Sequence, residues 1–248
     1  MCDSKFCTHA QPVTRRRFLQ SSAAFALAAM ASAGLSTMSS ATVHAAGLPK
    51  PRNAVSPDEA IQRLKAGNQR YVSGVMKRHD FSHERKALAG GQNPYAAILG
   101  CADSRVAPEY TFDSGRGDLF VTRVAGNFVN DDMVGSLEYA VAVLSVPSIL
   151  VLGHEKCGAI AAAVKAITDN TRYPGHIETL VAALTPTVKQ VSHQKTGLLE
   201  AAIEQNVRNN VAALTAQSDI LRKAHEAGSL RIVGGIYRLA TGKVDFLA

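Results

Sequence analysis

Two short polar clusters in the sequence carry the side chains best suited to metal chemistry. The first is Cys101-Ala-Asp103-Ser-Arg105, and the second is His154-Glu-Lys-Cys157. Two thiolates and one imidazole form a soft donor set that suits zinc. Three protein ligands leave one tetrahedral position open for water, which is typical of a catalytic zinc rather than a structural one. Asp103 lies close enough in the chain to fill that position, so a closed form of the site is an alternative.

A disulfide is the main competitor of zinc for these thiols. The chain has four cysteines, and two of them, Cys2 and Cys7, lie in an N-terminal segment that we expect to be removed. Cys101 and Cys157 then remain, and two cysteines in an oxidising compartment ordinarily predict one disulfide. Their positions after predicted strands, each beside further polar residues, favour the metal site instead.

The elements that must position both clusters are short apolar runs, each ending in glycine. Residues 95–100 precede the first cluster and residues 148–153 precede the second, and both runs are typical of buried strands. Further strands are predicted at 119–124, 230–239 and 243–247, with helices at 57–73, 136–144, 158–167, 177–192 and 198–225, and a loop with a short helix around 79–86. The alternation predicts an α/β fold with a mainly parallel central sheet flanked by helices. Ligands bind at the carboxyl ends of such strands, so both clusters can reach one crevice.

The first 45 residues have the features of an export signal. The stretch Thr14-Arg15-Arg16-Arg17-Phe18-Leu19-Gln20 resembles the twin-arginine export motif, and an Ala-rich, weakly apolar run follows it. This run is a poor permanent membrane span, and Val43-His44-Ala45 is a plausible small-residue cleavage site. An uncleaved anchor or an amphipathic surface helix is the alternative.

The organisation that follows is a cleaved signal at 1–45, a linker at 46–56 and a catalytic domain at 57–248. We expect the twin-arginine export machinery as a partner, a periplasmic or secreted bacterial location, and no stable membrane span in the mature form. Loss of the leader lowers the formal charge from +7 to +4 and leaves no dense run of Lys or Arg. The sequence therefore makes no case for nucleic-acid binding.

Several motifs together resemble the β-class carbonic anhydrases over roughly residues 57–248. The two clusters, at 101–106 and 153–159, match the zinc motifs of that family, and segments 117–123, 125–127, 136–141, 233–237 and 241–244 match it in order and spacing. The resemblance implies one Zn²⁺ per chain, bound by Cys101, His154 and Cys157. It also implies reversible hydration of carbon dioxide to bicarbonate and a proton, with zinc-bound hydroxide as the nucleophile.

Further roles follow from the same resemblance. Arg105 would hold Asp103 away from the metal through a charge-assisted pair, so that Asp103 can orient the nucleophile. Gln92, Phe120 and Tyr139 match residues of the substrate pocket, although aromatic residues at such positions are more often part of a core. The family builds its sites at a dimer interface, so a homodimer or higher even oligomer is expected.

Two other functions remain open on the sequence alone. Carbonyl sulfide and carbon disulfide hydrolases resemble this family closely, and a non-catalytic zinc- or bicarbonate-binding protein would keep Asp103 on the metal. Ile98 stands where relatives with a regulatory bicarbonate site carry Trp, which implies the open, constitutively active type. Glu155 and Lys156, between two ligands, are interpreted as solvated and inert.

Overall fold

The computed structural model describes residues 54–194 and 196–247, so the predicted leader and most of the predicted linker lie outside the described residues. A five-stranded sheet has the strand order β2-β1-β3-β4-β5. The strands are β1 (Ala96–Gly100), β2 (Leu119–Arg123), β3 (Ser148–His154), β4 (Arg231–Tyr237) and β5 (Val244–Leu247). The first four are parallel, and β5 pairs antiparallel with β4. The predicted α/β fold with a mainly parallel sheet is confirmed.

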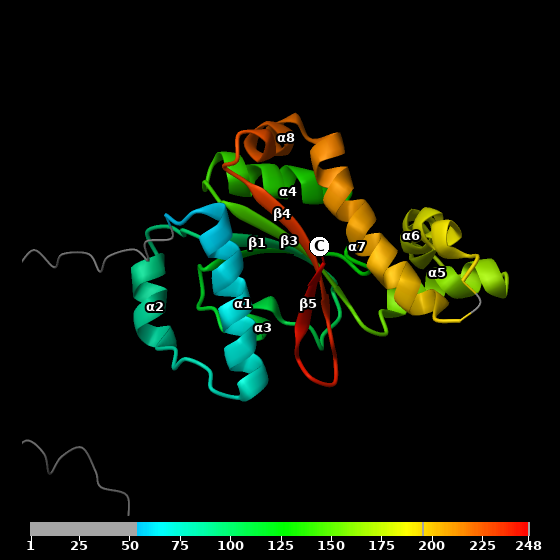
Figure 1. Ribbon diagram of the computed structural model, residues 1–248, viewed down its shortest axis with the longest axis horizontal. Coiled ribbons are helices and arrows are strands. Elements are labelled where there is room, and N and C mark those ends of the chain that lie inside the picture. Colours follow the sequence, from blue (N-terminus) through cyan, green and yellow to red (C-terminus); the bar gives the residue numbers. More distant parts are fainter. Residues whose placement is uncertain (1–53, 195, 248) are drawn as a thin grey trace, which may run out of the picture. The chain divides into compact units, whose positions relative to one another are not determined.

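Helices cover both faces of this sheet (Figure 1). They are α1 (Pro57–Ser73), α2 (Phe81–Leu88), α3 (Pro108–Thr111), α4 (Asp131–Ala142), α5 (Gly158–Thr168), α6 (Ile177–Val191), α7 (Leu198–Gln217) and α8 (Asp219–Glu226). Side chains alternate between the faces of a strand. Ala97 and Leu99 therefore join the core with α4–α8, whereas Ile98 joins a second core with α1. The central strands β1 and β3 are buried on both faces, as their continuous apolar runs predict.

Local capping explains where several helices begin. Ser56 caps α1 by accepting a hydrogen bond from the Glu59 amide, and Pro57 occupies the first turn, as predicted. The helix predicted at 136–144 begins earlier, at Asp131, because Asn130 caps it through the amide of Met133.

One predicted helix is wrong in its extent. The segment expected as a single helix at 198–225 is divided into α7 and α8 at Ser218, whose backbone is extended. The Ser218 hydroxyl accepts from the Leu221 amide and bonds to Glu138, so it stabilises the break. Helix α3 was not predicted, and its four residues are too short to show a periodic pattern.

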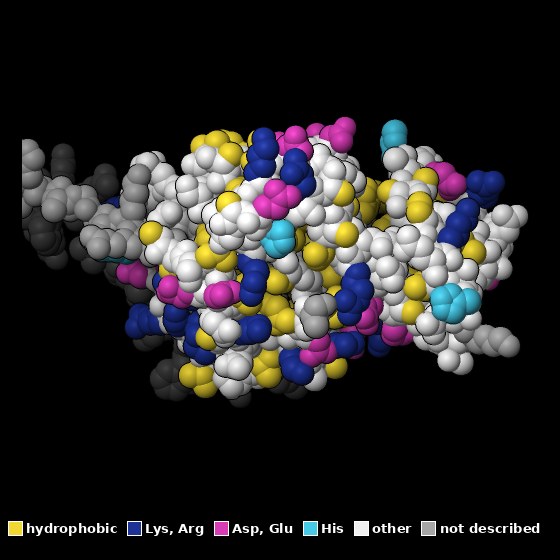
Figure 2. Space-filling view, turned by 45° about the horizontal axis from the view of Figure 1, so that its top comes forward, with side chains coloured by type: hydrophobic (Ala, Val, Ile, Leu, Met, Phe, Trp, Pro, Cys, Tyr) yellow, Lys and Arg dark blue, Asp and Glu magenta, His cyan; other side chains and the backbone are white. Residues whose placement is uncertain are grey.

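The surface of the described residues carries mixed charge. On the face in Figure 2, Lys and Arg side chains are interspersed with Asp and Glu. Within the described part of the chain, no helix is both long enough and apolar enough to cross a membrane.

Candidate metal centre

The three predicted metal ligands meet where β1 and β3 end. Cys101 follows β1 directly, His154 is the last residue of β3, and Cys157 is the N-cap of α5. Their ligand atoms lie within 4.8 Å of one another, and all three residues are buried. Both thiols are free in the structure, so the disulfide considered above is not formed. Sheet topology thus brings together residues that are far apart in the sequence, as predicted.

The imidazole of His154 is oriented as a metal ligand would be. Its Nδ1 lies 2.9 Å from the carbonyl oxygen of Glu155, which fixes Nδ1 as the donor and leaves Nε2 with a lone pair. Nε2 is buried and has no hydrogen-bond partner among the described residues. A buried polar atom without a partner is costly, and a cation bound between Nε2 and the two thiolates removes that cost. The donor set therefore fits zinc.

The two thiols also fit a divalent cation electrostatically. Hydrogen bonds from the Cys157 thiol and, to a lesser extent, from the Gly126 amide lower the pKa of Cys101, against the opposing effect of burial. The pKa of Cys157 is raised, first by its bond to Cys101 and then by burial. These opposite directions mean that ionisation of one thiol disfavours ionisation of the other, so the positive charge of a metal ion favours the form with two thiolates.

A tight turn after β2 supports the Cys101 sulfur. The Gly126 amide lies 3.3 Å from Cys101 Sγ, and the Gly126 carbonyl accepts from Asn206 on α7. Gly126 has a φ of +91°, and a Cβ there would lie 2.7 Å from a methyl of Leu184. Glycine is therefore required for this amide to approach the sulfur.

Asp103 and Arg105 form the predicted pair beside the ligands. Asp103 Oδ1 accepts from the Arg105 backbone amide and from Nε, both at 2.9 Å, and Oδ2 accepts from Nη2 at 2.7 Å. The hydrogen bonds from Arg105 hold the pKa of Asp103 well below its usual range, despite partial burial. Oδ2 lies 3.9 Å from His154 Nε2, so the carboxylate borders the metal centre while Arg105 holds it.

Arg123 is a supporting residue to which the sequence analysis assigned no role. Its guanidinium donates to the carbonyl oxygens of Cys101, Asp103 and Val106, at 2.7 to 2.8 Å. These carbonyls lie along the loop that carries Cys101 and the Asp103–Arg105 ion pair. Arg123 ends β2 and faces Gly100 in the parallel register, which places its side chain over this loop.

The three predicted pocket residues lie on β2, on α4 and in the segment before β1. Phe120 on β2 and Tyr139 on α4 have ring centroids 6.3 Å apart, and Tyr139 is 48% exposed. Gln92 is exposed in the segment between α2 and β1. Among the described residues, no hydrogen bond or ring contact joins any of the three to the ligands.

Lys156 is exposed as predicted, and Glu155 is partly exposed, but its carboxylate is also bound by other residues of the chain. The Glu155 carboxylate accepts from the Leu239 amide at 3.0 Å and from Arg238 at 3.2 Å. These partners lie more than 80 residues further along the chain, so no local pattern could have indicated them.

Comparison with known proteins agrees with this geometry. Residues 96–244 match the family model described as carbonic anhydrase. The chain is 42% identical over 189 residues to carbonic anhydrase 2 of Mycobacterium tuberculosis, covering 76% of this chain and 91% of that protein. It is 40% identical over 193 residues to carbonic anhydrase of Mycolicibacterium smegmatis, covering 77% and 93%.

A solved structure, that of the β-carbonic anhydrase CcaA, has the same fold. Its TM-score is 0.61 at 30% identity, over 77% of this chain and 92% of that one. The β-carbonic anhydrase of Coccomyxa in complex with acetazolamide gives a TM-score of 0.58 at 28% identity, over 77% and 82%. The chain therefore belongs to the β class of the carbonic anhydrase family, enzymes that hydrate carbon dioxide.

Proposed function

We propose that this enzyme hydrates carbon dioxide reversibly at one zinc ion bound by Cys101, His154 and Cys157, with Asp103 and Arg105 orienting the reacting water. The observation that carries the proposal is the buried cluster of two thiols and one imidazole nitrogen within 4.8 Å. A three-ligand set of this kind leaves a coordination position for substrate chemistry.

Zinc bound here would act as a Lewis acid and lower the pKa of its water from the bulk value to about 7, so that a nucleophile is available near neutral pH. The protein's contribution is orientation. Asp103 is ionised because Arg105 donates to both of its oxygens, and its Oδ2 faces the ligand cluster. An ionised carboxylate accepts a hydrogen bond and donates none, so it fixes the direction in which a lone pair of the nucleophile points.

The Asp103–Arg105 pair also favours the open, catalytic form over a closed binding protein. A closed form would need Asp103 to leave Arg105 and become the fourth ligand. The backbone amide and the guanidinium of Arg105 donate hydrogen bonds to both carboxylate oxygens of Asp103, and these bonds hold Asp103 in its present rotamer. Arg105 itself is held by a contact of 3.4 Å from Nη2 to the Lys156 carbonyl, which links both clusters.

A second copy of the chain would complete the pocket. Phe120 lies partly buried on β2, which is an edge strand. Tyr139 on α4 and Val143, the residue that follows this helix, are 48% and 60% exposed. A partly buried aromatic ring beside exposed apolar side chains at a sheet edge is typical of an interface. We infer a homodimer or higher even oligomer in which these residues, with Gln92, line the partner's substrate pocket.

Export remains a proposal that rests on residues 1–45. The twin-arginine route moves folded proteins, so the thiolates would bind zinc before they meet an oxidising compartment. We propose a periplasmic or secreted enzyme that is delivered by that machinery. Fractionation of cells that express the full chain, compared with a variant in which Arg15, Arg16 and Arg17 are all Lys, tests this; equal delivery of both would contradict it.

Substrate choice is tested by rates on three gases. We expect the zinc-loaded enzyme to hydrate carbon dioxide at least about a hundredfold faster, per zinc, than it hydrolyses carbonyl sulfide or carbon disulfide. Comparable rates would favour the hydrolase alternative.

Metal analysis with thiol titration, before and after chelation, tests the metal site itself. One zinc per chain and two thiols released by the chelator are expected, and two unreactive cysteines without zinc would indicate a disulfide.

A further inference from the structure

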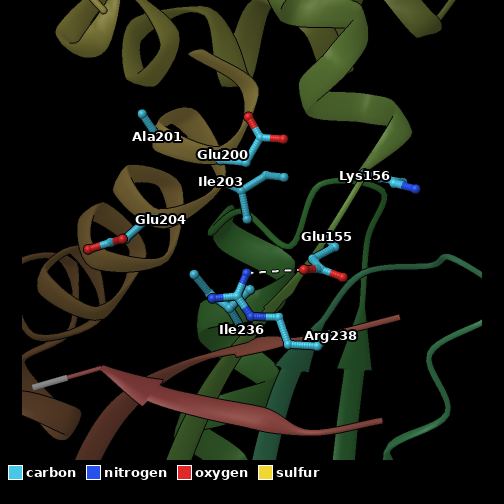
Figure 3. Close-up of a pocket in the computed structure, with 8 residues that line it drawn as sticks. All are labelled: Glu155, Lys156, Glu200, Ala201, Ile203, Glu204, Ile236 and Arg238. Atoms are coloured by element: carbon cyan, nitrogen blue, oxygen red, sulfur yellow. Dashed lines mark hydrogen bonds and ion pairs between the residues drawn. The ribbon is translucent and has the colours of Figure 1, made fainter. Parts of the chain in front are cut away.

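We propose that Glu155 is a positioning residue of the metal centre, which orients His154 and Arg105 by fixing the backbone between the two ligands of the second cluster. This inference rests on the proposed zinc function and extends it to a residue between the ligands. Glu155 lines a cavity of about 400 Å³. Figure 3 shows its carboxylate directed at Arg238.

The backbone amide, the backbone carbonyl and both carboxylate oxygens of Glu155 each have a hydrogen-bond partner in the chain. The backbone amide donates to the Tyr237 carbonyl at 3.0 Å. The carboxylate binds the Leu239 amide through Oε2 and Arg238 through Oε1. The side chain is 31% exposed, so water weakens the ion pair, but the bond to the backbone amide is geometrically fixed.

The partners of Glu155 are themselves rigidly placed. Arg238 also binds Asp245 at 2.7 Å, and its backbone amide donates to the Lys243 carbonyl across the β4–β5 turn. The Glu155 carboxylate therefore ties the loop between the ligands to a paired hairpin of the sheet rather than to a free surface side chain.

Two backbone carbonyls on that loop act on the site. The Glu155 carbonyl accepts from His154 Nδ1 at 2.9 Å and so aims Nε2 at the two thiols. The next carbonyl, that of Lys156, receives Nη2 of Arg105. One peptide segment thus controls the orientation of a zinc ligand and of the cation that restrains Asp103.

This segment needs restraint because its backbone is unfavourable. Lys156 has a φ of +51°, in the left-handed region that residues with a Cβ rarely adopt. Without the bonds from Leu239 and Arg238, Lys156 is free to leave that region. Its relaxation would rotate the peptide between Glu155 and Lys156 and turn the orienting carbonyl away from His154. Glu155 thus stabilises a conformation that the chain would not hold by itself.

The experiment compares Glu155→Ala and Glu155→Gln with the control Glu200→Gln. Glu200 lines the same cavity from α7, so the control removes the same charge from the same space without touching the loop. Three readouts are used: the rate of zinc transfer to a chromophoric chelator, the absorption spectrum of the cobalt-substituted protein, and kcat and KM for carbon dioxide hydration.

We expect Glu155→Ala to release zinc about 10 to 100 times faster than wild type, to shift the cobalt spectrum, and to lower kcat with KM little changed. Glu155→Gln keeps an oxygen for the Leu239 amide and should recover most of the loss. Glu200→Gln should match wild type in all three readouts. If Glu155→Ala does not fold, Glu155→Asp replaces it; its shorter carboxylate cannot keep both bonds, and zinc release should be several times faster than in wild type.

The inference would be overturned if Glu155→Ala, or Glu155→Asp in its place, matched Glu200→Gln in zinc release and in the cobalt spectrum. That result would not contradict the proposed function. A loss that Glu155→Gln shares in full would also overturn it, because the retained acceptor would then be irrelevant. A wild-type protein that binds no zinc would contradict the proposed function and this inference with it.

Discussion

Replacement of Asp103 by Asn probes the orienting group with the smallest change in shape. Oδ1 accepts two hydrogen bonds, from the amide and Nε of Arg105, whereas Oδ2 accepts one and borders the ligand cluster. The amide oxygen of Asn should keep the position with two donors. Its NH₂ group then takes the place of Oδ2, so a donor replaces the acceptor that faces the reacting water.

The expected cost follows from that exchange. A positioned acceptor for a reacting proton contributes about 10² to 10⁴ in rate. Asp103 is partly open to solvent, with a side chain 16% exposed, which favours the lower half of that range. We therefore expect kcat/KM to fall about 10² to 10³-fold, equivalent to about 3–4 kcal/mol in the activation barrier.

The assay is stopped-flow hydration of carbon dioxide with rates expressed per bound zinc. Asp132→Asn is the matched control, because Asp132 is an exposed carboxylate on α4. Zinc content should be equal in wild type and both variants. A rate for Asp103→Asn within about threefold of the control would remove Asp103 from the mechanism. Loss of zinc from Asp103→Asn would instead indicate that Asp103 is a ligand, as in the closed form.

Three further outcomes are expected. Arg123→Met removes donors to three carbonyls of the ligand loop and should lower the free energy of unfolding by about 2 kcal/mol and kcat at least severalfold; wild-type values of both would contradict its supporting role. Gly67→Ala would place a Cβ 1.9 Å from the Phe112 carbonyl oxygen and should cost about 2–3 kcal/mol in urea unfolding, and a cost below about 0.5 kcal/mol would contradict the packing described. Because Arg105 depresses the pKa of Asp103, the stability that this carboxylate adds is present above about pH 4 and is lost as the pH falls further. The difference in unfolding free energy between wild type and Asp103→Asn should therefore be constant from about pH 7 to 5. A decline within that interval would contradict the ion pair.

The meeting of Cys101, His154 and Cys157 could be predicted because it depends on two simple features. Each run that precedes a ligand is short, apolar and ends in glycine, so the end of the strand is visible in the sequence. Parallel strands then bring their carboxyl ends to one edge regardless of the number of residues between them. Cys101 and His154 were placed correctly at strand ends for this reason, and all five strands lie within one or two residues of the predicted bounds.

The supporting residues could not be predicted because their partners are distant in sequence. Arg123 acts on the ligand loop only because β2 lies beside β1 in the observed register. Glu155 depends on Leu239 and Arg238, which the β3–β4 pairing brings alongside. A polar residue in a loop looks solvated until the element that contacts it is known.

The break at Ser218 has the same origin. Its hydroxyl bonds to Glu138 on α4, so tertiary contact decides that a continuous helical pattern is divided. Tyr139 is 48% exposed in the single chain. Its proposed place in the pocket depends on a second copy, whose position cannot be read from one sequence.

Dependence of carbon dioxide hydration on zinc is the most direct test of the account. The enzyme is stripped with a chelator under reducing conditions, assayed by stopped flow, and then reloaded with one equivalent of zinc. We expect hydration to fall to the uncatalysed rate and to return in proportion to the zinc bound, whereas Cys101→Ser and Cys157→Ser should not recover. Full activity in the stripped protein, or none after one zinc per chain is restored, would contradict it.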